Sequence, residues 1–154
     1  MRIIHSLKAR REQDGFTLIE LMVVVLIIAI LIAIAIPTFL SARESAQNRA
    51  AQSDLRNALI GAKTHYTNEE SYTALDAAAL EALEPSLEYV DGAGTQAEVG
   101  VDSTDDTTTL MKESKTGEFY AICESVADGS EGTTYGEGAD SATAAGCTLG
   151  TEGW

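Results

Sequence analysis

The hydrophobic residues of this chain are concentrated near its N-terminus, in one continuous run. From Leu21 to Ile36 every residue is apolar, and extending the run back to Phe16 adds only one charged side chain, Glu20. As a helix, residues 16–36 would be about 32 Å long, close to the thickness of the hydrocarbon core of a bilayer. The pattern therefore predicts a helix that is able to cross a membrane.

Beyond this run the helical periodicity continues in an amphipathic form. Pro37 lacks an amide hydrogen and clashes with the carbonyl group of Ala33, so we expect a kink there. No turn signal then interrupts the chain until about Asn68, and apolar residues recur on one helix face: Ala51, Leu55, Ala58, Leu59, Ala62 and Tyr66. Residues 16–68 would form a rod of about 80 Å. The remaining domain does not need such a length for its own core, so the excess must pack against something outside the molecule.

After about Asn68 the period changes from that of helices to that of strands. Thr73 and Asp76 have the spacing of a capping box and open a short helix that Pro85 stops. Separated by turn signals, the predicted strands cover residues 87–90, 97–101, 107–112, 118–126 and, more weakly, 133–135. Residues 136–154 are rich in small side chains and are expected to be irregular. The fold class is therefore α+β, a long helix packed on a small antiparallel sheet.

The charge of the chain is distributed very unevenly. The net charge is −14, yet residues 1–15 carry four basic and two acidic side chains, a net of +2. From residue 64 onward, 19 acidic side chains stand against Lys112 and Lys115, a net of −17. This acidic part would repel phosphate backbones, so we expect no direct binding of nucleic acid. Basic residues before an apolar span place the N-terminus in the cytoplasm and the acidic part outside.

Two cysteines, Cys123 and Cys147, lie in the acidic part. Outside the cytoplasm a pair of thiols favours a disulfide over a metal or redox site. Closing this loop would contribute about 3 kcal/mol in the chain-entropy model. Two unpaired, buried cysteines are the alternative.

Three basic residues, Arg49, Arg56 and Lys63, recur every seven positions and form a basic stripe on the predicted helix. A solvated helix face is the simpler interpretation. Because the acidic residues crowd the C-terminal part, pairing of the basic stripe with a neighbouring copy is a second hypothesis.

Motifs for catalysis or cofactor binding are absent from the sequence. It contains no glycine-rich phosphate loop, nucleophile elbow or HExxH helix, so we expect neither an enzyme nor a cofactor. Asp102, Asp105 and Asp106 are candidate calcium ligands, but their spacing misses the EF-hand pattern and acidic turns are common in acidic proteins. The prediction is therefore that no metal is bound.

The start of the apolar run carries a recognisable motif. Gly15-Phe16-Thr17-Leu18-Ile19-Glu20, after a short basic leader and before a long apolar helix, resembles the type IV prepilin signature. The resemblance continues through Ala35-Ile36-Pro37 and covers about residues 8–67. Beyond that it is architectural, through a strand-rich head and a C-terminal cysteine pair, and the head is most similar to Gram-positive, actinobacterial pilins.

The resemblance implies a defined processing route. A membrane aspartyl peptidase, the prepilin peptidase, would cut between Gly15 and Phe16 on the cytoplasmic side, and Phe16 would become an N-methylated N-terminus. An ordinary signal peptide would instead lose the apolar helix, and the chain has no good cleavage site for one. The four segments would be a leader (1–15), an apolar filament-core helix (16–40), its amphipathic continuation (41–68) and a head (69–154).

The resemblance also implies a structural function. The chain would be a single-pass membrane protein before assembly and part of an extracellular pilus afterwards, serving adhesion, twitching motility or DNA uptake. Its partners would be prepilin peptidase, an assembly ATPase with its membrane platform, and other copies of itself in a helical filament.

Glu20 and Pro37 match functional positions of this family. A carboxylate inside a bilayer costs about 2.5–3.5 kcal/mol on insertion scales and usually marks function. The new amine of Phe16 in one copy could pair with Glu20 of its neighbour and set the axial register; alternatively, Glu20 only sits at the level of the lipid headgroups. Pro37 matches the helix-breaking proline. Ala29 departs from the glycine of many bacterial pilins, which leaves open whether the helix between Ala29 and Pro37 unwinds in a filament.

Two alternatives use the same N-terminal pattern differently. A type II secretion pseudopilin shares the pattern of residues 15–37 but forms a short periplasmic piston. Many major pseudopilins lack the cysteine pair and use a calcium loop, so Cys123 and Cys147 favour a pilin. A membrane-anchored enzyme or binding domain would keep Met1 and gather polar groups in its head.

Overall fold

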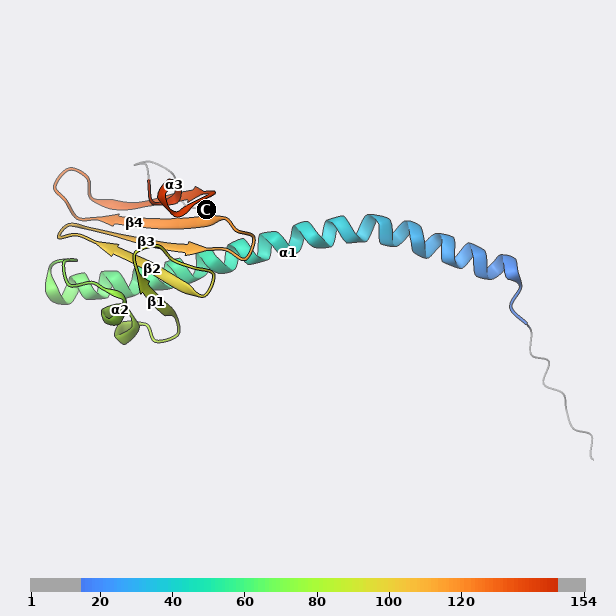
Figure 1. Ribbon diagram of the computed structural model, residues 1–154, viewed down its shortest axis with the longest axis horizontal. Helices are drawn as coiled ribbons and strands as arrows, with labels where there is room; N and C mark the ends of the chain where they lie inside the picture. Colours follow the sequence, from blue (N-terminus) through green and yellow to red (C-terminus); the bar gives the residue numbers. More distant parts are fainter. Residues whose placement is uncertain (1–14, 147–154) are drawn as a thin grey trace, which may run out of the picture. The chain divides into compact units, whose positions relative to one another are not determined.

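The computed structural model describes residues 15–146, and the chain divides into two compact units between Leu40 and Ser41. Within these residues the chain forms three helices and five strands, and Figure 1 shows how they are arranged along the chain. Their bounds are α1 Leu18–Glu69, α2 Ala77–Leu83, β1 Glu88–Asp91, β2 Glu98–Ser103, β3 Thr107–Glu113, β4 Phe119–Ser125, β5 Gly132–Gly138 and α3 Ser141–Ala145. The predicted α+β class is confirmed, and α1 ends within one residue of its predicted end.

The described part of the first unit consists mainly of the apolar portion of α1. This portion is long and apolar enough to cross a membrane, and none of it is buried. Pro37 lies inside the helix, and the Thr38 hydroxyl donates a hydrogen bond to the carbonyl oxygen of Ile34 at 3.1 Å. The predicted kink at Pro37 stays a prediction.

In the second unit, the amphipathic portion of α1 packs on one face of the sheet. The predicted apolar positions are in the core or against it: Ala51, Leu55, Ala58 and Ala62 are buried, and Leu59 and Tyr66 are partly buried. Gly61 and His65 are also buried, which the apolar period did not indicate. Gly61 lies beside α2, where a Cβ atom would be 3.2 Å from Leu80 Cδ2.

The five strands are arranged in chain order, and each pairs with the one before it. Three of the four pairs are antiparallel, whereas β1 and β2 are parallel, with Tyr89 opposite Val99. The predicted antiparallel sheet is therefore mostly antiparallel, and the β1–β2 pair is its one departure within the described residues.

A short glycine-containing connection makes the parallel pair possible. The chain between Asp91 and Glu98 turns back across β2, and the amide of Gly92 donates to the carbonyl oxygen of Val101 at 2.8 Å. A Cβ atom at Gly100 would lie 2.6 Å from the carbonyl carbon of Ala93, so this close crossing requires glycine.

The short helix α2 begins later than the proposed capping box indicated. Its N-cap is Asp76, whose carboxylate accepts a hydrogen bond from the amide of Ala79 at 2.8 Å. Thr73 instead donates its hydroxyl to Asp105 at 2.9 Å. The two residues therefore have separate partners and do not form one box.

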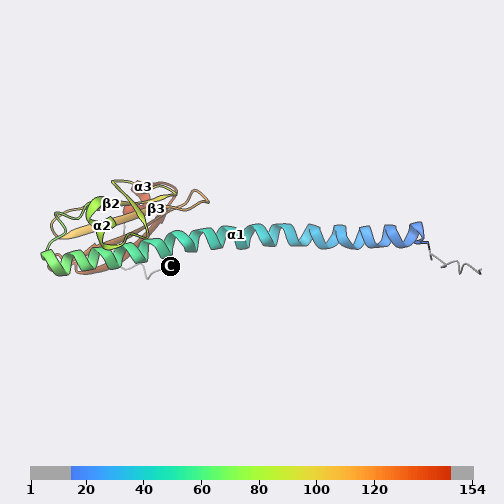
Figure 2. The same ribbon diagram turned by 90° about the horizontal axis from the view of Figure 1, so that it is seen from below.

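The segment after residue 135 is more regular than predicted. Strand β5 continues to Gly138, and α3 follows with Asp140 as its N-cap, accepting from the amide of Thr143 at 2.7 Å. Helix α3 packs with Met111 and Ala121 on the sheet face opposite α1 (Figure 2). A Cβ atom at Gly138 would lie 2.7 Å from Thr143 Cβ, so the missing side chain lets α3 approach the sheet.

Candidate functional site

The proposed cleavage position lies just before the first helical turn. Gly15 and Phe16 are exposed and outside the helix, which begins at Leu18. The Phe16 side chain is 76% exposed. The Gly15–Phe16 bond is therefore in accessible, non-helical chain, the form that a peptidase needs for cleavage.

Thr17 and Glu20 form a reciprocal capping box at the start of α1. Glu20 Oε2 accepts hydrogen bonds from the Thr17 amide at 2.9 Å and the Thr17 hydroxyl at 2.6 Å. The Glu20 amide donates in return to Thr17 Oγ1 at 3.3 Å. This arrangement satisfies amide groups that the first turn of a helix leaves without a partner.

The capping box was missed by the sequence analysis, although its signal is present. Threonine followed three residues later by glutamate, before an apolar run, is the usual pattern of a helix start. The box gives Glu20 a role in its own chain. It occupies only Oε2, and no donor within residues 15–146 contacts Oε1. One carboxylate oxygen is therefore available to a cation from outside the chain.

An exposed apolar surface follows the capping box. The large hydrophobic side chains from Phe16 to Leu40 are between 45% and 76% exposed. Burying apolar area contributes about 25 cal/mol per Å², so a surface of this extent requires lipid or other apolar helices around it.

The basic stripe lies on the exposed side of α1, and its members differ in their surroundings. Arg49 and Arg56 are exposed. The Lys63 ammonium lies 3.2 Å from Glu124 Oε1 and donates to the Thr133 hydroxyl at 3.2 Å. The charge of Lys63 is thus matched within its own head, and pairing of the stripe with a second copy stays a prediction.

The candidate calcium ligands lie on and after β2. Asp102 is in the strand, and Asp105 and Asp106 are in the turn that follows. Asp105 Oδ1 accepts hydrogen bonds from the hydroxyls of Ser71 at 2.7 Å and Thr73 at 2.9 Å, which lower the pKa of Asp105. Within residues 15–146, no three His, Cys, Asp or Glu side chains are grouped to hold a metal ion. Asp105 links the chain after α1 to the β2–β3 turn.

Cys123 lies in β4, on the sheet face that carries α3. Its sulfur is 3.7 Å from the carbonyl oxygen of Ala145 and 3.7 Å from the Thr109 hydroxyl. Cys147 falls outside the described residues, as does the basic leader before Gly15. The disulfide therefore stays a prediction.

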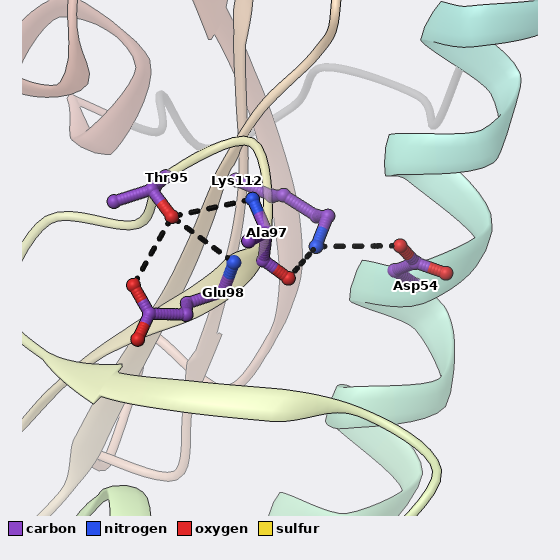
Figure 3. A network of polar contacts seen from close by, with 5 residues as sticks. All are labelled: Asp54, Thr95, Ala97, Glu98 and Lys112. Atoms are coloured by element: carbon purple, nitrogen blue, oxygen red, sulfur yellow. Dashed lines mark hydrogen bonds and ion pairs between the residues drawn. The ribbon is translucent and has the colours of Figure 1, made fainter.

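An ion pair between α1 and the sheet was also missed by the sequence analysis. Lys112 is only 5% exposed, and its ammonium lies 3.4 Å from Asp54 Oδ2. The same ammonium donates to the carbonyl oxygen of Ala97 at 3.0 Å, beside the start of β2 (Figure 3). Asp54 and Lys112 are far apart in the sequence, and no local pattern links them.

The comparisons with known proteins agree with this geometry at the N-terminus. Residues 10–36 match the family model of the prokaryotic N-terminal methylation motif, a range that includes the capping box and most of the exposed apolar surface. No curated protein and no solved structure matched the chain. The motif indicates a structural subunit, and it implies processing by prepilin peptidase and assembly into a pilus or pseudopilus.

The family match, the long apolar helix and the α+β head point to one class of proteins. The motif and the helix together support a membrane-anchored precursor. Residues 10–36 carry the prokaryotic N-terminal methylation motif, and the long N-terminal helix followed by a mostly antiparallel five-stranded sheet is a pilin-like architecture.

Proposed function

We propose that this chain is the structural subunit of a type IV pilus, cut between Gly15 and Phe16 and assembled through its N-terminal helix. The observation that carries the proposal is the exposure of the large apolar side chains from Phe16 to Leu40, directly after the processing motif. Before assembly, lipid covers this surface, with the N-terminus in the cytoplasm. In the filament, the equivalent helices of other copies cover it.

The carboxylate of Glu20 supports assembly beyond simple anchoring. Cleavage creates an ammonium group on Phe16, one helical turn from Glu20. Glu20 Oε2 is used by Thr17 of the same chain, and Oε1 is left for a neighbour. In an apolar bundle each charge needs a partner, so pairing Oε1 with the Phe16 ammonium of the next copy favours one axial offset.

The head would be the part that such a filament presents to its surroundings. A disulfide between Cys123 and Cys147 would fasten the end of α3 to β4, and the short distance from the Cys123 sulfur to the Ala145 carbonyl supports this pairing. Surface fibres of this kind would serve adhesion, twitching motility or DNA uptake. Prepilin peptidase, an assembly ATPase and a membrane platform would be the partners.

Mass spectrometry of assembled material tests the proposal. The full chain is produced together with a prepilin peptidase and a pilus assembly machinery, and sheared surface fibres are collected. We expect a mature chain that begins at Phe16 and carries a methyl group on its amine. An intact Met1–Gly15 leader in the fibres, or processed chains that remain as single bilayer-anchored copies, would contradict the proposal.

Electron microscopy of the same cells separates the pilus from the pseudopilus. A pilin gives long fibres on the cell surface at native expression. Short assemblies confined to the periplasm would instead support a type II secretion pseudopilin.

A further inference from the structure

The head has opposite charge character at its two ends, and we propose that the acidic end of one copy docks in a basic groove of the next. The inference rests on the proposed function, because it describes how neighbouring heads of a filament would recognise one another. It concerns only the second unit.

Contacts along α1 define the two ends of the head. Near the start of the unit, Asn48 Oδ1 accepts hydrogen bonds from the hydroxyls of Ser114 at 2.6 Å and Thr116 at 2.7 Å, which places the β3–β4 turn there. Just after the end of α1, the amide of Tyr72 donates to the carbonyl oxygen of Asp105 at 3.0 Å. The β2–β3 turn is therefore at the opposite end of the head.

A groove of about 430 Å³ lies at the first end, between α1 and the segments around the start of β2 and the end of β3. Its charged lining consists of Arg43, Asp54, Lys112, Glu113 and Lys115. We call this the basic groove.

Of the two acidic residues of the basic groove, one has a cationic partner and the other a neutral one. Asp54 pairs with Lys112 at 3.4 Å, and Glu113 accepts a hydrogen bond from the Gln96 side chain at 3.1 Å. Arg43 and Lys115 are exposed and make no ion pair within residues 15–146. Asp54 and Lys112 neutralise one another, so Arg43 and Lys115 stand against the single charge of Glu113 and the charged lining of the basic groove has a net charge of +1.

The other end of the head is acidic. The β2–β3 and β4–β5 turns meet there, because the amide of Val126 donates to the carbonyl oxygen of Asp106 at 2.9 Å. With the end of α1 they form a surface that we call the acidic tip: Glu69, Glu70, Asp105, Asp106, Asp128 and Glu131, all exposed. The nearest basic residue in the sequence, Lys63, is paired with Glu124. The acidic tip therefore presents unmatched negative charge.

A second copy of this chain is the partner that these two surfaces fit. The chain has a net charge of −14, and removal of the leader with its net charge of +2 makes each copy more acidic still. Copies therefore repel one another in general, so an attractive contact must place acidic residues on the few unmatched basic ones. A contact between two different surfaces of the same molecule is heterologous, and it repeats into an open helical assembly when the rotation does not close. The acidic tip in the basic groove is a contact of this kind and points every copy in the same direction.

Charge reversal and charge exchange in the full chain test this docking. We expect Lys115→Glu and Asp106→Lys each to lower the yield of surface fibres by about fivefold or more, and the double variant to return to within about twofold of the unsubstituted chain. Glu131→Lys provides a second substitution of the acidic tip. Glu81→Lys is the matched control for the two substitutions of the acidic tip, because it makes the same charge change on α2, outside both surfaces, and should leave the yield unchanged.

Cross-linking of fibres provides an independent measurement. Fibres assembled from a mixture of isotopically labelled and unlabelled copies are treated with a carbodiimide, which joins ammonium and carboxylate groups in direct contact. Peptides that link Lys115 of one copy to Asp106, Asp128 or Glu131 of another are the expected product.

The outcomes separate this docking from the proposed function. Unchanged fibre yield in both single variants, no recovery in the double variant, or cross-links from Lys115 to other surfaces would overturn the docking while fibres still form. A chain that forms no fibres without any substitution would overturn the proposed function itself.

Discussion

At the scale of single residues, Glu20 meets two different demands. Within its own chain it completes a capping box with Thr17 through Oε2. Between copies, in the proposed filament, its Oε1 atom would pair with the ammonium group that cleavage after Gly15 would create. Capping by Glu20 needs only its own helix, whereas the pairing between copies needs a neighbour.

Substitutions at the two ends of the capping box separate these roles. We expect Glu20→Ala to lower fibre yield by about tenfold or more, because the carboxylate is lost to both partners. Thr17→Val removes only the hydroxyl, costs about 1 kcal/mol of helix capping and should leave yield within about twofold of the unsubstituted chain. Quantitative shearing assays give the yields, and the thermal unfolding of the head should be the same in both variants. If the two variants lost fibres equally, helix capping alone would explain the effect of Glu20, and its pairing between copies would be contradicted.

Buried tyrosines make the stability of the head sensitive to high pH. Burial, with a smaller effect from the nearby Glu124, raises the pKa of Tyr72 to about 12, and burial raises the pKa of Tyr89 to about 12 as well. The folded state therefore favours the neutral phenol. The stabilisation of the folded head by the two neutral phenols is fully present below pH 10, and it is lost as the pH rises from 10 toward 12.

Thermal unfolding in detergent between pH 9 and pH 12 checks this expectation. The midpoint should fall steeply above pH 10 in the unsubstituted chain and less steeply in a Tyr72→Phe, Tyr89→Phe double variant, which has no phenol to ionise at these sites. If the unfolding midpoint fell equally steeply with pH in both proteins, groups other than Tyr72 and Tyr89 would control the loss of stability.

At the scale of elements, local patterns predicted most of the fold and left out the contacts between distant residues. The helical spacing of Leu55, Ala58 and Ala62 correctly predicted the buried face of α1, and the alternation of side chains correctly predicted the five strands of the described residues. The parallel pairing of β1 and β2 could not be predicted in this way. It depends on the close crossing of Gly92, Ala93 and Gly100, which no local propensity describes.

The candidate site shows the same limit. The N-terminal motif is contiguous, so it could be recognised from the sequence alone, and the family match includes Gly15, Phe16 and Glu20. The roles of these residues in processing and assembly stay predictions. The burial of Lys112 depends on Asp54 in a distant element, and the sequence indicated only an isolated base in an acidic region. The Thr17–Glu20 capping box, by contrast, has a local signal, because its threonine and glutamate stand three residues apart before an apolar run.

Gly100 offers a direct test of the crossing that makes β1 and β2 parallel. A Cβ atom there would meet backbone atoms, which cannot move aside as a flexible side chain can. We expect Gly100→Ala to lower the free energy of unfolding by about 2 kcal/mol or more, as for other overpacked sites.

Gly61→Ala is the matched control for this substitution. Its Cβ atom would meet the flexible end of Leu80 at 3.2 Å, and the gain in helix propensity of about 1 kcal/mol offsets that contact. The net change should be below about 1 kcal/mol, measured by denaturant unfolding in detergent. A Gly100→Ala variant as stable as the control would show that the crossing has room to relax.

At the scale of the whole molecule, the two units have opposite solvent requirements. The apolar portion of α1 exposes large hydrophobic side chains, whereas the head has its own core and an acidic surface. In the proposed filament each unit would therefore join in its own way, the helix through burial of apolar area and the head through charge complementarity. The apolar surroundings that the helix needs do not change the packing of the core of the head, and the aqueous surroundings of the head do not change the apolar surface of the helix.

Peptide mapping tests whether the C-terminal part of the head is covalently fastened. Under non-reducing conditions we expect a peptide that joins Cys123 to Cys147. Reduction should lower the free energy of unfolding of the head by about 3 kcal/mol. A Cys123→Ala, Cys147→Ala variant controls for effects of the reductant elsewhere. Two free thiols in the mature protein would exclude the disulfide.

The chain-order arrangement of the sheet has a consequence for export. In the proposed orientation the N-terminus stays in the cytoplasm, so the amphipathic part of α1 crosses the membrane first. Strands β1 to β5 then follow in succession, and each strand after β1 finds its neighbour already present. Every hairpin can close over a short loop, so no strand has to wait for a distant segment before it pairs. The head is therefore able to fold progressively on the outer side of the membrane while its last residues are still being translocated.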